Sequence, residues 1–310
     1  MTRQTHKAAG PFDWFFAQPH LLLILTTLFW GANLTLGRAI AGHMPPVSTA
    51  CLRWVGAFVL TLPFTWGALK RDWPIVKHAW PILLILGACG IGAFNTFAYI
   101  GLQYTEAVNG VLIQSFGPLL IAAFSFLIFG DRLTIGQAVG ILTSLTGVLT
   151  IIARGSVDRL IGLALNPGDL WVMAAILCYS LYSALLKKRP AISSASLAVL
   201  LFGIGAAMLI PFALYEQAGG RSFEVTPFTM ISLAYFILFP SIAATFFFNR
   251  GVQLIGPNRA GPYFHLIPVF GSLFAILFLG ERFAMYHAVG YTLILTGILI
   301  AQRWRPRAAA

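Results

Sequence analysis

The chain is a succession of long apolar runs separated by short segments that are polar or contain proline. A helix that crosses the hydrocarbon core of a bilayer takes roughly 20 residues, and the runs reach that length. They lack the period-two alternation of a membrane barrel, and backbone groups in lipid must be satisfied within one element, so the pattern predicts helices. We expect ten spans, at about 20–40, 45–67, 79–101, 108–129, 134–153, 167–187, 193–215, 227–249, 258–279 and 284–302.

Turns that end these helices are predicted where proline and glycine interrupt the apolar pattern, because both residues weaken a continuing helix. The clearest are Pro45-Pro46, Trp73-Pro74, Asn166-Pro167-Gly168 and Arg189-Pro190.

The composition indicates a membrane protein and excludes an ordinary soluble one. Of the 310 residues, 58% are hydrophobic and only 9% are charged, with a mean hydropathy of +0.83. A soluble domain needs about a quarter charged residues to cover its surface. The three cysteines, Cys51, Cys89 and Cys178, fall inside predicted spans, where they act as small apolar packing residues and indicate no disulfide framework.

The net charge of +11 indicates orientation in the membrane and not nucleic-acid binding, because the side on which the cations lie is what matters in such a chain. With the N-terminus inside, fourteen of the twenty basic residues fall on the cytoplasmic side, so both termini are expected in the cytoplasm. The fourteen are Arg3, Lys7, Lys70, Arg71, Lys77, Arg132, Lys187, Lys188, Arg189, Arg250, Arg259, Arg303, Arg305 and Arg307, against Arg38, Arg53, Arg154, Arg159, Arg221 and Arg282.

The sequence repeats itself at an offset of 150 residues. The segment "GDRLTIGQAVG" at 130–140 recurs as "GERFAMYHAVG" at 280–290, and further identities recur without a gap from about 93 to 153. We expect the repeated segment to be a tight turn, in which Gly130 ends one helix and Thr134 with Gln137 forms a capping box for the next.

The repeat divides the chain into two units of five helices, 1–155 and 156–310. Because five is odd, the second unit enters the membrane from the opposite side. The predicted fold is therefore an all-α integral membrane protein with ten transmembrane helices in two inverted five-helix repeats. Exchanging the conformations of two such units converts an outward-open cavity into an inward-open one, so we expect a secondary transporter that works by alternating access without a cofactor or metal.

These segments resemble the EamA-type transporters of the drug/metabolite transporter superfamily. The resemblance rests on "FWGANLTLGR" in the first span, on Arg53, and on the blocks Pro118…Gly130-Asp131-Arg132 and Pro268…Gly280-Glu281-Arg282. It implies placement in the bacterial inner membrane and a central cavity lined mainly by the first, third, fourth, sixth, eighth and ninth spans. Within the family, the aromatic-rich chain is similar to YddG-type exporters of aromatic amino acids. The sixth span, "LCYSLYSALLKK", departs from the first, so the two halves need not contribute equally to a site.

Polar and aromatic residues inside the spans are the candidates for substrate binding, because polar groups in a membrane are costly. Their amides and hydroxyls can hydrogen-bond a carboxylate and an ammonium group, and their rings can face an aromatic or cationic ligand. The alternative for each residue is that it joins helices together. The predicted substrate-binding residues are Trp30, Asn33, Asn95, Tyr99, Gln114, Tyr179, Tyr182 and His265.

Two prolines and a glycine pair are candidates for helix mechanics. Pro118 and Pro268 each remove a backbone donor and weaken their helix, which produces either a static kink or a flex point. We favour flex points, because both units keep the proline. Gly136 and Gly140 have the spacing of a close interhelical contact or a dimer face, and a monomer is expected.

No carboxylate is expected at mid-membrane, since all nine acids fall in tails, loops or helix ends. Ion-coupled carriers usually need one there, so facilitated diffusion is predicted. His265 is the titratable exception, for which we favour a neutral hydrogen-bonding role. Arg53 either neutralises a substrate carboxylate or, as we favour, pairs with an acid such as Glu106 or snorkels to the interface.

Two rival functions remain open. A carrier of nucleotide sugars or phosphorylated metabolites needs several cations in its cavity, for which Arg53 is the clear candidate. In an intramembrane enzyme, Ser115 and His265 can form a dyad, but the chain has no Gly-x-Ser-x-Gly elbow, HExxH motif or paired intramembrane aspartates. We therefore expect a non-enzymatic exporter whose partners are the lipid bilayer and a small amphipathic metabolite, with aromatic or neutral amino acids favoured.

Overall fold

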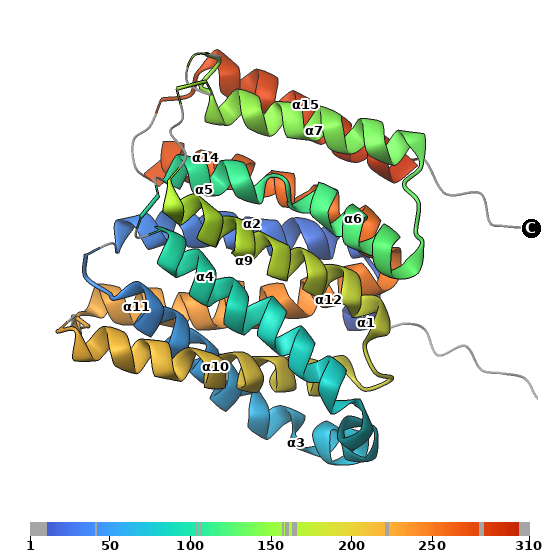
Figure 1. Cartoon of the computed structure of the whole chain (residues 1–310), viewed down its shortest axis with the longest axis vertical. Helices are drawn as coiled ribbons and strands as arrows, with labels where there is room; N and C mark the ends of the chain where they lie inside the picture. Colours follow the sequence, from blue (N-terminus) through green and yellow to red (C-terminus); the bar gives the residue numbers. More distant parts are fainter. Residues whose placement is uncertain are drawn as a thin grey trace, which may run out of the picture.

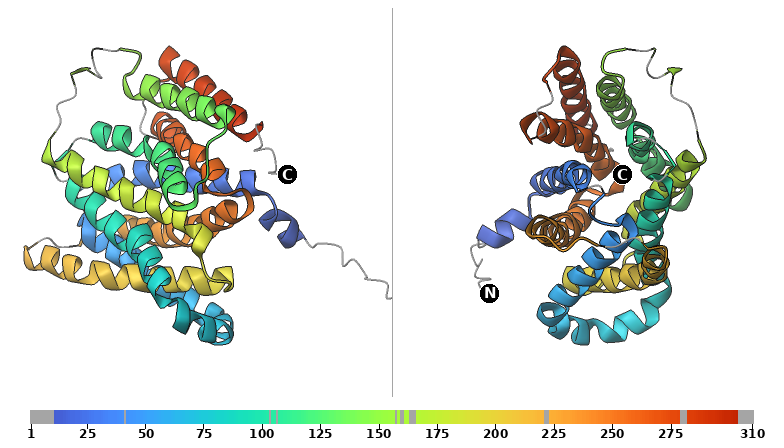
Figure 2. Two further views of the ribbon diagram at one scale, coloured as in Figure 1. Left: turned by 45° about the vertical axis from the view of Figure 1, so that its right-hand side comes forward. Right: turned by 90° about the vertical axis from the view of Figure 1, so that its left-hand side faces the viewer.

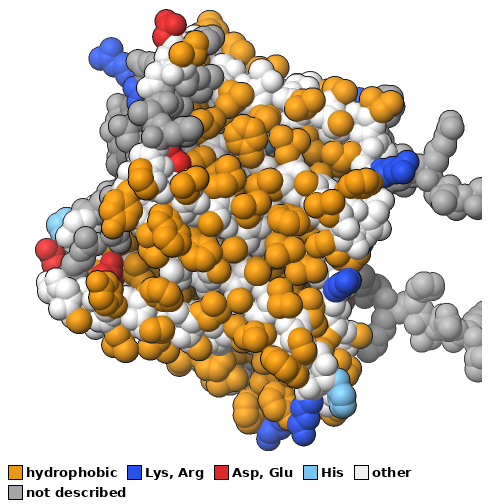
Figure 3. All heavy atoms as spheres, viewed as in Figure 1, with side chains coloured by type: hydrophobic (Ala, Val, Ile, Leu, Met, Phe, Trp, Pro, Cys, Tyr) orange, Lys and Arg blue, Asp and Glu red, His pale blue; other side chains and the backbone are white. Residues whose placement is uncertain are grey.

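The computed structural model describes residues 11–40, 42–102, 104–105, 107–156, 158, 161–162, 166–220, 223–278 and 282–303, and these ranges form a bundle of helices without strands (Figure 1). Apolar side chains cover the middle of the face shown in Figure 3, as expected where lipid is the solvent. The elements are α1 (Pro11–Phe16), α2 (Pro19–Ala39), α3 (Pro46–Gly87), η1 (Ala88–Gly92), α4 (Ala93–Leu102), α5 (Ala107–Gln114), α6 (Gly117–Phe129), α7 (Ile135–Ile152), α9 (Pro167–Leu185), η2 (Leu186–Lys188), α10 (Ser194–Ala218), α11 (Pro227–Phe236), η3 (Ile237–Ala243), α12 (Ala244–Ile255), α13 (Pro257–Ala260), η4 (Gly261–His265), α14 (Leu266–Phe278) and α15 (Met285–Arg303).

Nine helical stretches of the described chain are long and apolar enough to cross a membrane, against ten predicted spans. The second and third spans form one stretch, Pro46–Ala98. The predicted break at Trp73-Pro74 is wrong, because a proline removes one hydrogen bond and can bend a helix without ending it. At one end of the bundle α3 bends, and α4 runs back in the opposite direction, so this stretch still crosses the bundle twice (Figures 1 and 2).

The start of α2 and the end of α15 lie on the same side of the bundle, as an even number of crossings requires (Figure 1). We call this side the terminal face. The connections at 42–45 and 223–226 lie on the other side, which we call the opposite face.

Helix contacts in the first half of the chain recur in the second half at the offset of 150 residues. The α4 helix packs against α9, and its counterpart α12 packs against α2. Likewise α6 packs against α9, and α14 packs against α2. The pairs α3–α10 and α7–α15 each join a helix to its own counterpart. The boundary between residues 155 and 156 stays a prediction, because part of the following connection lies outside the described residues.

The repeated turn of the first unit has the predicted construction. Gly130 ends α6 in the left-handed region, with φ of 69°. The backbone N–H of Gln137 donates to Thr134 Oγ1 at 3.2 Å, and the N–H of Thr134 donates to Gln137 Oε1 at 2.9 Å. The capping box is therefore confirmed. Gly280 and Glu281 of the second copy lie outside the described residues.

Glycines bring α7 and α15 into backbone contact. A Cβ atom on Gly140 would lie 2.5 Å from the Gly297 carbonyl oxygen, and one on Gly147 would lie 2.6 Å from that of Gly290. The two contacts are crosswise: Gly290 is the counterpart of Gly140, and Gly297 is the counterpart of Gly147. The interhelical contact predicted at Gly140 is confirmed, and this glycine is not part of a free dimer face.

Carboxylates join α3 and α10 at both ends. Asp72, on α3, accepts from the Ser193 N–H at 2.8 Å and from Ser196 Oγ at 2.7 Å, at the start of α10. Glu216, near the end of α10, accepts from the Ser48 N–H at 2.7 Å, at the start of α3. Each acid satisfies donors at a helix N-terminus, where negative charge is favourable. The reciprocal pattern holds this helix pair together at the terminal face and at the opposite face.

We expect Gly140→Ala to destabilise the protein, because its Cβ meets the backbone of α15, which cannot move without shifting the helix. Overpacking of this kind costs roughly 1–3 kcal/mol. Thermal unfolding in detergent, followed by loss of the monodisperse species, measures the effect. Gly67→Ala is the matched control, since nothing lies within 4 Å of its Cβ position. Equal melting temperatures of the two variants would contradict the packing role.

Candidate functional site

One cavity of about 540 Å³ lies between the two halves of the bundle. It is lined by residues of α2, α3, η1, α4 and α5 from the first half and of α9, α11, η3, α12, η4 and α14 from the second. Gly42 and Met44, in the connection at the opposite face, also line it, as does Pro46, the first residue of α3. The cavity therefore extends from the middle of the bundle to the opposite face.

Aromatic rings form the inner end of the cavity, which we call the aromatic floor. Its members are Trp30, Phe94, Tyr179, Tyr182 and Phe264. Tyr179 is central: its ring centroid lies 4.9 Å from that of Phe94, 5.5 Å from that of Phe264 and 5.8 Å from that of Trp30. Edge-to-face packing fixes the rings and presents both faces and edges to the cavity.

Uncharged polar side chains line the walls above the floor. Asn33, Thr49, Asn95, Gln114 and Thr245 all contribute. The Asn95 amide donates to the Ile91 carbonyl oxygen at 2.7 Å, within its own helix. Its carbonyl oxygen is an additional acceptor. The walls thus combine amides and hydroxyls with no Asp or Glu among the lining residues that the structure describes.

Two π-helices, η1 and η3, occur at positions related by the 150-residue offset, and both line the cavity. Pro240 lacks an N–H, so the Phe236 carbonyl oxygen loses its helical donor. The Ser241 hydroxyl replaces that donor at 2.7 Å, and the Trp30 indole N–H donates to the Pro240 carbonyl oxygen at 3.2 Å. Such segments are frequent at functional sites, and neither was predicted from the sequence.

Arg53 contributes to the cavity wall, although the interpretation favoured from sequence kept it near the interface. The residue is only 7% exposed, so snorkelling to the surface is wrong. Its Nε donates to Ser241 Oγ at 2.9 Å, and its guanidinium lies 4.9 Å from the centroid of the Trp54 ring. Pairing with Glu106 stays a prediction, because Glu106 lies outside the described residues.

The structure brings together six of the eight predicted binding residues. Trp30, Asn33, Asn95, Gln114, Tyr179 and Tyr182 all line the cavity. The side chain of Tyr99 lies outside the described residues. Sequence reasoning did not single out Phe94, Phe264, Thr49 or Thr245, since single Phe and Thr residues carry no pattern that separates a cavity wall from a packed core.

His265 lies beside the cavity but does not line it, and it joins helices. Its Nδ1 lies 2.6 Å from Ser144 Oγ, and its Nε2 lies 2.9 Å from the Ser115 carbonyl oxygen. It lines a separate space of about 20 Å³, which has no room for a metabolite. The Ser115 hydroxyl donates to the Leu112 carbonyl oxygen at 2.6 Å, so the Ser–His dyad of the rival enzyme interpretation does not form.

Pro118 and Pro268 both stand close to the start of a helix that follows an irregular segment. Pro118 lies in the first turn of α6, after the break between α5 and α6, and Pro268 lies in the first turn of α14, after the 3-10 helix η4. Proline is well tolerated there, because the first N–H groups of a helix have no intrahelical acceptor. Whether the two positions flex stays a prediction.

Below the aromatic floor, contacts close the bundle toward the terminal face. The Tyr182 hydroxyl donates to Asn249 Oδ1, joining α9 to α12. His20 Nδ1 lies 2.5 Å from the Tyr263 hydroxyl, joining α2 to η4. The ring of Phe247 packs against those of Phe15 and Phe16, with centroids 5.4 Å and 5.9 Å apart. We call these contacts the terminal-face seal.

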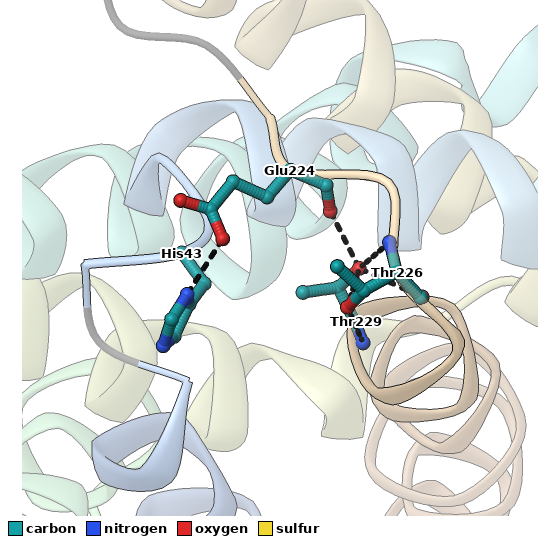
Figure 4. Close-up of polar contacts among 4 residues, drawn as sticks. All are labelled: His43, Glu224, Thr226 and Thr229. Carbon is teal, nitrogen blue, oxygen red and sulfur yellow. Dashed lines mark hydrogen bonds and ion pairs between the residues drawn. The ribbon is translucent and has the colours of Figure 1, made fainter.

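At the opposite face, a hydrogen bond between side chains joins the two connections that lie next to the cavity mouth (Figure 4). Glu224 Oε2 lies 2.7 Å from His43 Nδ1, and the Glu224 N–H donates to the His43 carbonyl oxygen at 3.1 Å. Thr226 and Thr229 form a capping box at the start of α11, and Thr229 Oγ1 also donates to the Glu224 carbonyl oxygen at 2.5 Å. The His43–Glu224 contacts thus link the connection 42–45 with 223–226, beside the open cavity.

Comparisons with known proteins agree with this architecture. The chain is 28% identical over 289 residues to an uncharacterized transporter, YyaM, of Bacillus subtilis, covering 91% of this chain and 92% of that protein. It is 26% identical over 306 residues to an Escherichia coli protein named "probable amino-acid metabolite efflux pump", covering 92% and 96%. A crystal structure with a TM-score of 0.75 and 19% identity, covering 91% of this chain and 96% of the other, shares the fold.

The family profile matches the chain twice, over residues 18–153 and 166–302. These segments include every helix that lines the cavity, and the relatives are named as transporters and not as enzymes. The chain belongs to the EamA-like transporter family, and it is a multi-pass membrane transporter.

Proposed function

We propose that this transporter exports small amphipathic metabolites, with aromatic or neutral amino acids favoured, across the bacterial inner membrane by facilitated diffusion. The observation that carries the proposal is the cavity itself: about 540 Å³, with an aromatic floor and polar walls of amides, hydroxyls and one arginine, Arg53. Small-molecule sites usually measure about 300–1,000 Å³ and combine an apolar lining with a few polar groups.

The two parts of the cavity suit the two parts of an amino acid. The rings of Trp30 and Tyr179 can hold an aromatic or apolar side chain at the floor. The amides of Asn33, Asn95 and Gln114 offer donors to a carboxylate and acceptors to an ammonium group. The Escherichia coli relative, whose name refers to amino-acid metabolites, supports the same substrate class.

Alternating access is supported by a cavity that reaches one face and is closed from the other. In this conformation the opposite face is open, and the terminal-face seal is closed. Exchange of the conformations of the two halves would open the terminal face. The π-helices η1 and η3, which line the cavity at equivalent positions, are the proposed places where the helices bend. One chain builds the whole cavity, which supports a monomeric transport unit.

Facilitated diffusion is supported by the distribution of titratable groups. Among the described lining residues there is no carboxylate, and the histidine deep in a span has partners at both ring nitrogens outside the cavity. A coupling proton or sodium ion generally needs such a group within the pathway. Doubly charged phosphates are disfavoured as substrates, because Arg53 is the one cation in the described lining.

The orientation of the chain is proposed from its charges. Lys and Arg side chains gather mainly toward the terminal face, and Asp and Glu toward the opposite face (Figure 3). The positive-inside rule then puts the terminal face, with both ends of the chain, in the cytoplasm.

The first test is exchange of radiolabelled tryptophan and phenylalanine in proteoliposomes, with and without an imposed pH gradient, against protein-free liposomes. We expect equilibration that does not depend on the gradient, because no coupling group lies in the pathway. Accumulation only under a pH gradient would contradict facilitated diffusion. No flux of any amino acid would contradict the proposed substrate class.

The polar walls are tested by Asn33→Ala and Gln114→Ala. A hydrogen bond to a charged group is worth about 1.5–3 kcal/mol, so each variant should raise KM for phenylalanine roughly tenfold or more. Gln217→Ala is the control, since Gln217 is an exposed residue at the end of α10. Unchanged KM in both wall variants would show that these amides join helices instead of binding substrate.

The terminal-face seal is tested by Tyr182→Phe, which leaves the buried Asn249 without the tyrosine hydroxyl. An orphaned buried group costs about 1–3 kcal/mol, so the inward-open population should rise about tenfold. The reporter is Thr245→Cys in the cavity, with the three native cysteines replaced by alanine, labelled by an impermeant maleimide from the terminal face. Tyr215→Phe is the exposed control. Equal labelling rates in the two variants would exclude the hydroxyl from the seal.

A further inference from the structure

Two arginines lie on neighbouring segments at the terminal face, next to the seal. Arg189 follows η2 at the end of α9, and Arg250 follows Asn249 on α12. The α12 helix packs against η2, and both arginines are half-buried. Burial, and second the charge of Arg250, lower the pKa of Arg189 from its ordinary value, although an arginine stays protonated. The two positive charges therefore act on one another.

The Arg250 side chain is held in place by neutral acceptors. Its Nε donates to the Phe16 carbonyl oxygen at 3.0 Å, and its Nη1 donates to Gln253 Oε1 at 2.9 Å. Neither acceptor cancels the charge. The Arg189 guanidinium forms no ion pair or side-chain hydrogen bond with any part of the chain that the structure describes.

Three other cations on the same face have partners within the described chain. Lys187 pairs with Asp131, and Arg71 lies 3.8 Å from Asp72. Arg259 donates to both oxygens of Gln302. Asp72 lies near the start of α10 but accepts from Ser193 and Ser196. Within the described ranges, no carboxylate forms an ion pair with Arg189 or Arg250.

Two half-buried guanidinium groups repel one another, and an oxyanion between them removes the repulsion and accepts several charge-assisted hydrogen bonds. Guanidinium is well suited to this role, because its planar donors match the two oxygens of a carboxylate. We propose that Arg189 and Arg250 form an oxyanion-binding subsite at the terminal-face mouth, which takes the carboxylate of the transported substrate before it reaches the cavity.

The position of the pair gives the subsite its role in transport. Arg250 Nε donates to the carbonyl oxygen of Phe16, whose ring packs against Phe247 in the terminal-face seal. A carboxylate bound at the pair would therefore lie next to the seal that separates the cytoplasmic side from the cavity. This role rests on the proposed export of amino acids; the oxyanion site itself does not. A phospholipid headgroup carries the same oxyanion chemistry, so the experiment separates the two sources.

The primary variant is Arg189→Gln, since no described side-chain contact depends on this arginine. KM for phenylalanine is measured from the terminal face, in vesicles of neutral phosphatidylcholine whose sidedness is set by impermeant labelling. Loss of a charge-assisted contact to the carboxylate should raise KM roughly three- to tenfold, which corresponds to about 0.7–1.4 kcal/mol. KM for phenylalanine amide, which lacks the carboxylate, should not change. Lys188→Gln, an exposed cation on the same face, is the matched control.

Equal KM values in Arg189→Gln and the parent protein, or an equal rise for the amide, would overturn the substrate role. A rise seen only when anionic lipid is present would assign the pair to a headgroup and overturn it as well.

A second readout does not need transport. At constant ionic strength, sulfate should raise the melting temperature of the purified protein and should raise that of Arg189→Gln less. Identical sulfate responses would overturn the subsite itself. If sulfate raises the melting temperature through Arg189 but no amino acid is exchanged, the proposed substrate class is overturned. The oxyanion site itself would then still be supported.

Discussion

Every backbone donor and acceptor of a lipid-covered helix must be satisfied within the protein, and this constraint organises the whole structure. Regular α-helices satisfy it alone, so the lipid-facing parts of the bundle are regular. The departures, η1, η3, η4 and the break before α6, gather at or beside the cavity and the central His265. There, side chains complete the backbone: Ser241 supplies the donor that Pro240 lacks, and His265 contacts the Ser115 carbonyl oxygen. These irregular segments therefore lie where the proposed movement takes place, whereas the short 3-10 helix η2 lies at the terminal face.

The backbone of the two halves is symmetric, but their side chains are not. Contacts between helices recur at an offset of 150 residues, and the glycine contacts of α7 and α15 are crosswise. At the same offset, however, Arg53 corresponds to Gly203, and Tyr182 corresponds to Ala32. The cavity wall therefore has its cation on one side only, and the Tyr182–Asn249 hydrogen bond of the terminal-face seal has no identical counterpart. Two conformations related by the fold can thus differ in energy, because different side chains close them.

Much of the architecture could be predicted from the sequence. Apolar runs of membrane-spanning length, the repeat, and the capping box at Thr134 depend on local composition and spacing, which a chain displays directly. The break at Trp73-Pro74 was predicted wrongly, since a proline tells where a helix is weakened but not whether neighbouring turns carry it through. The π-helices could not be predicted, because an extra residue in a helical turn leaves the apolar pattern nearly unchanged.

For the candidate site, the sequence by itself determined which polar and aromatic residues lie within spans, and tertiary structure decided which of them share a cavity. Trp30, Asn95 and Tyr179 come from three helices, and only packing brings them to one space. The same packing placed His265 among Ser144 and Ser115 instead, and turned Arg53 inward. The periodicity of a helix indicates whether a residue faces protein or lipid. Which residue it then contacts depends on how helices far apart in the sequence cross. That crossing is set by close contacts such as those of Gly140, which a linear pattern does not contain.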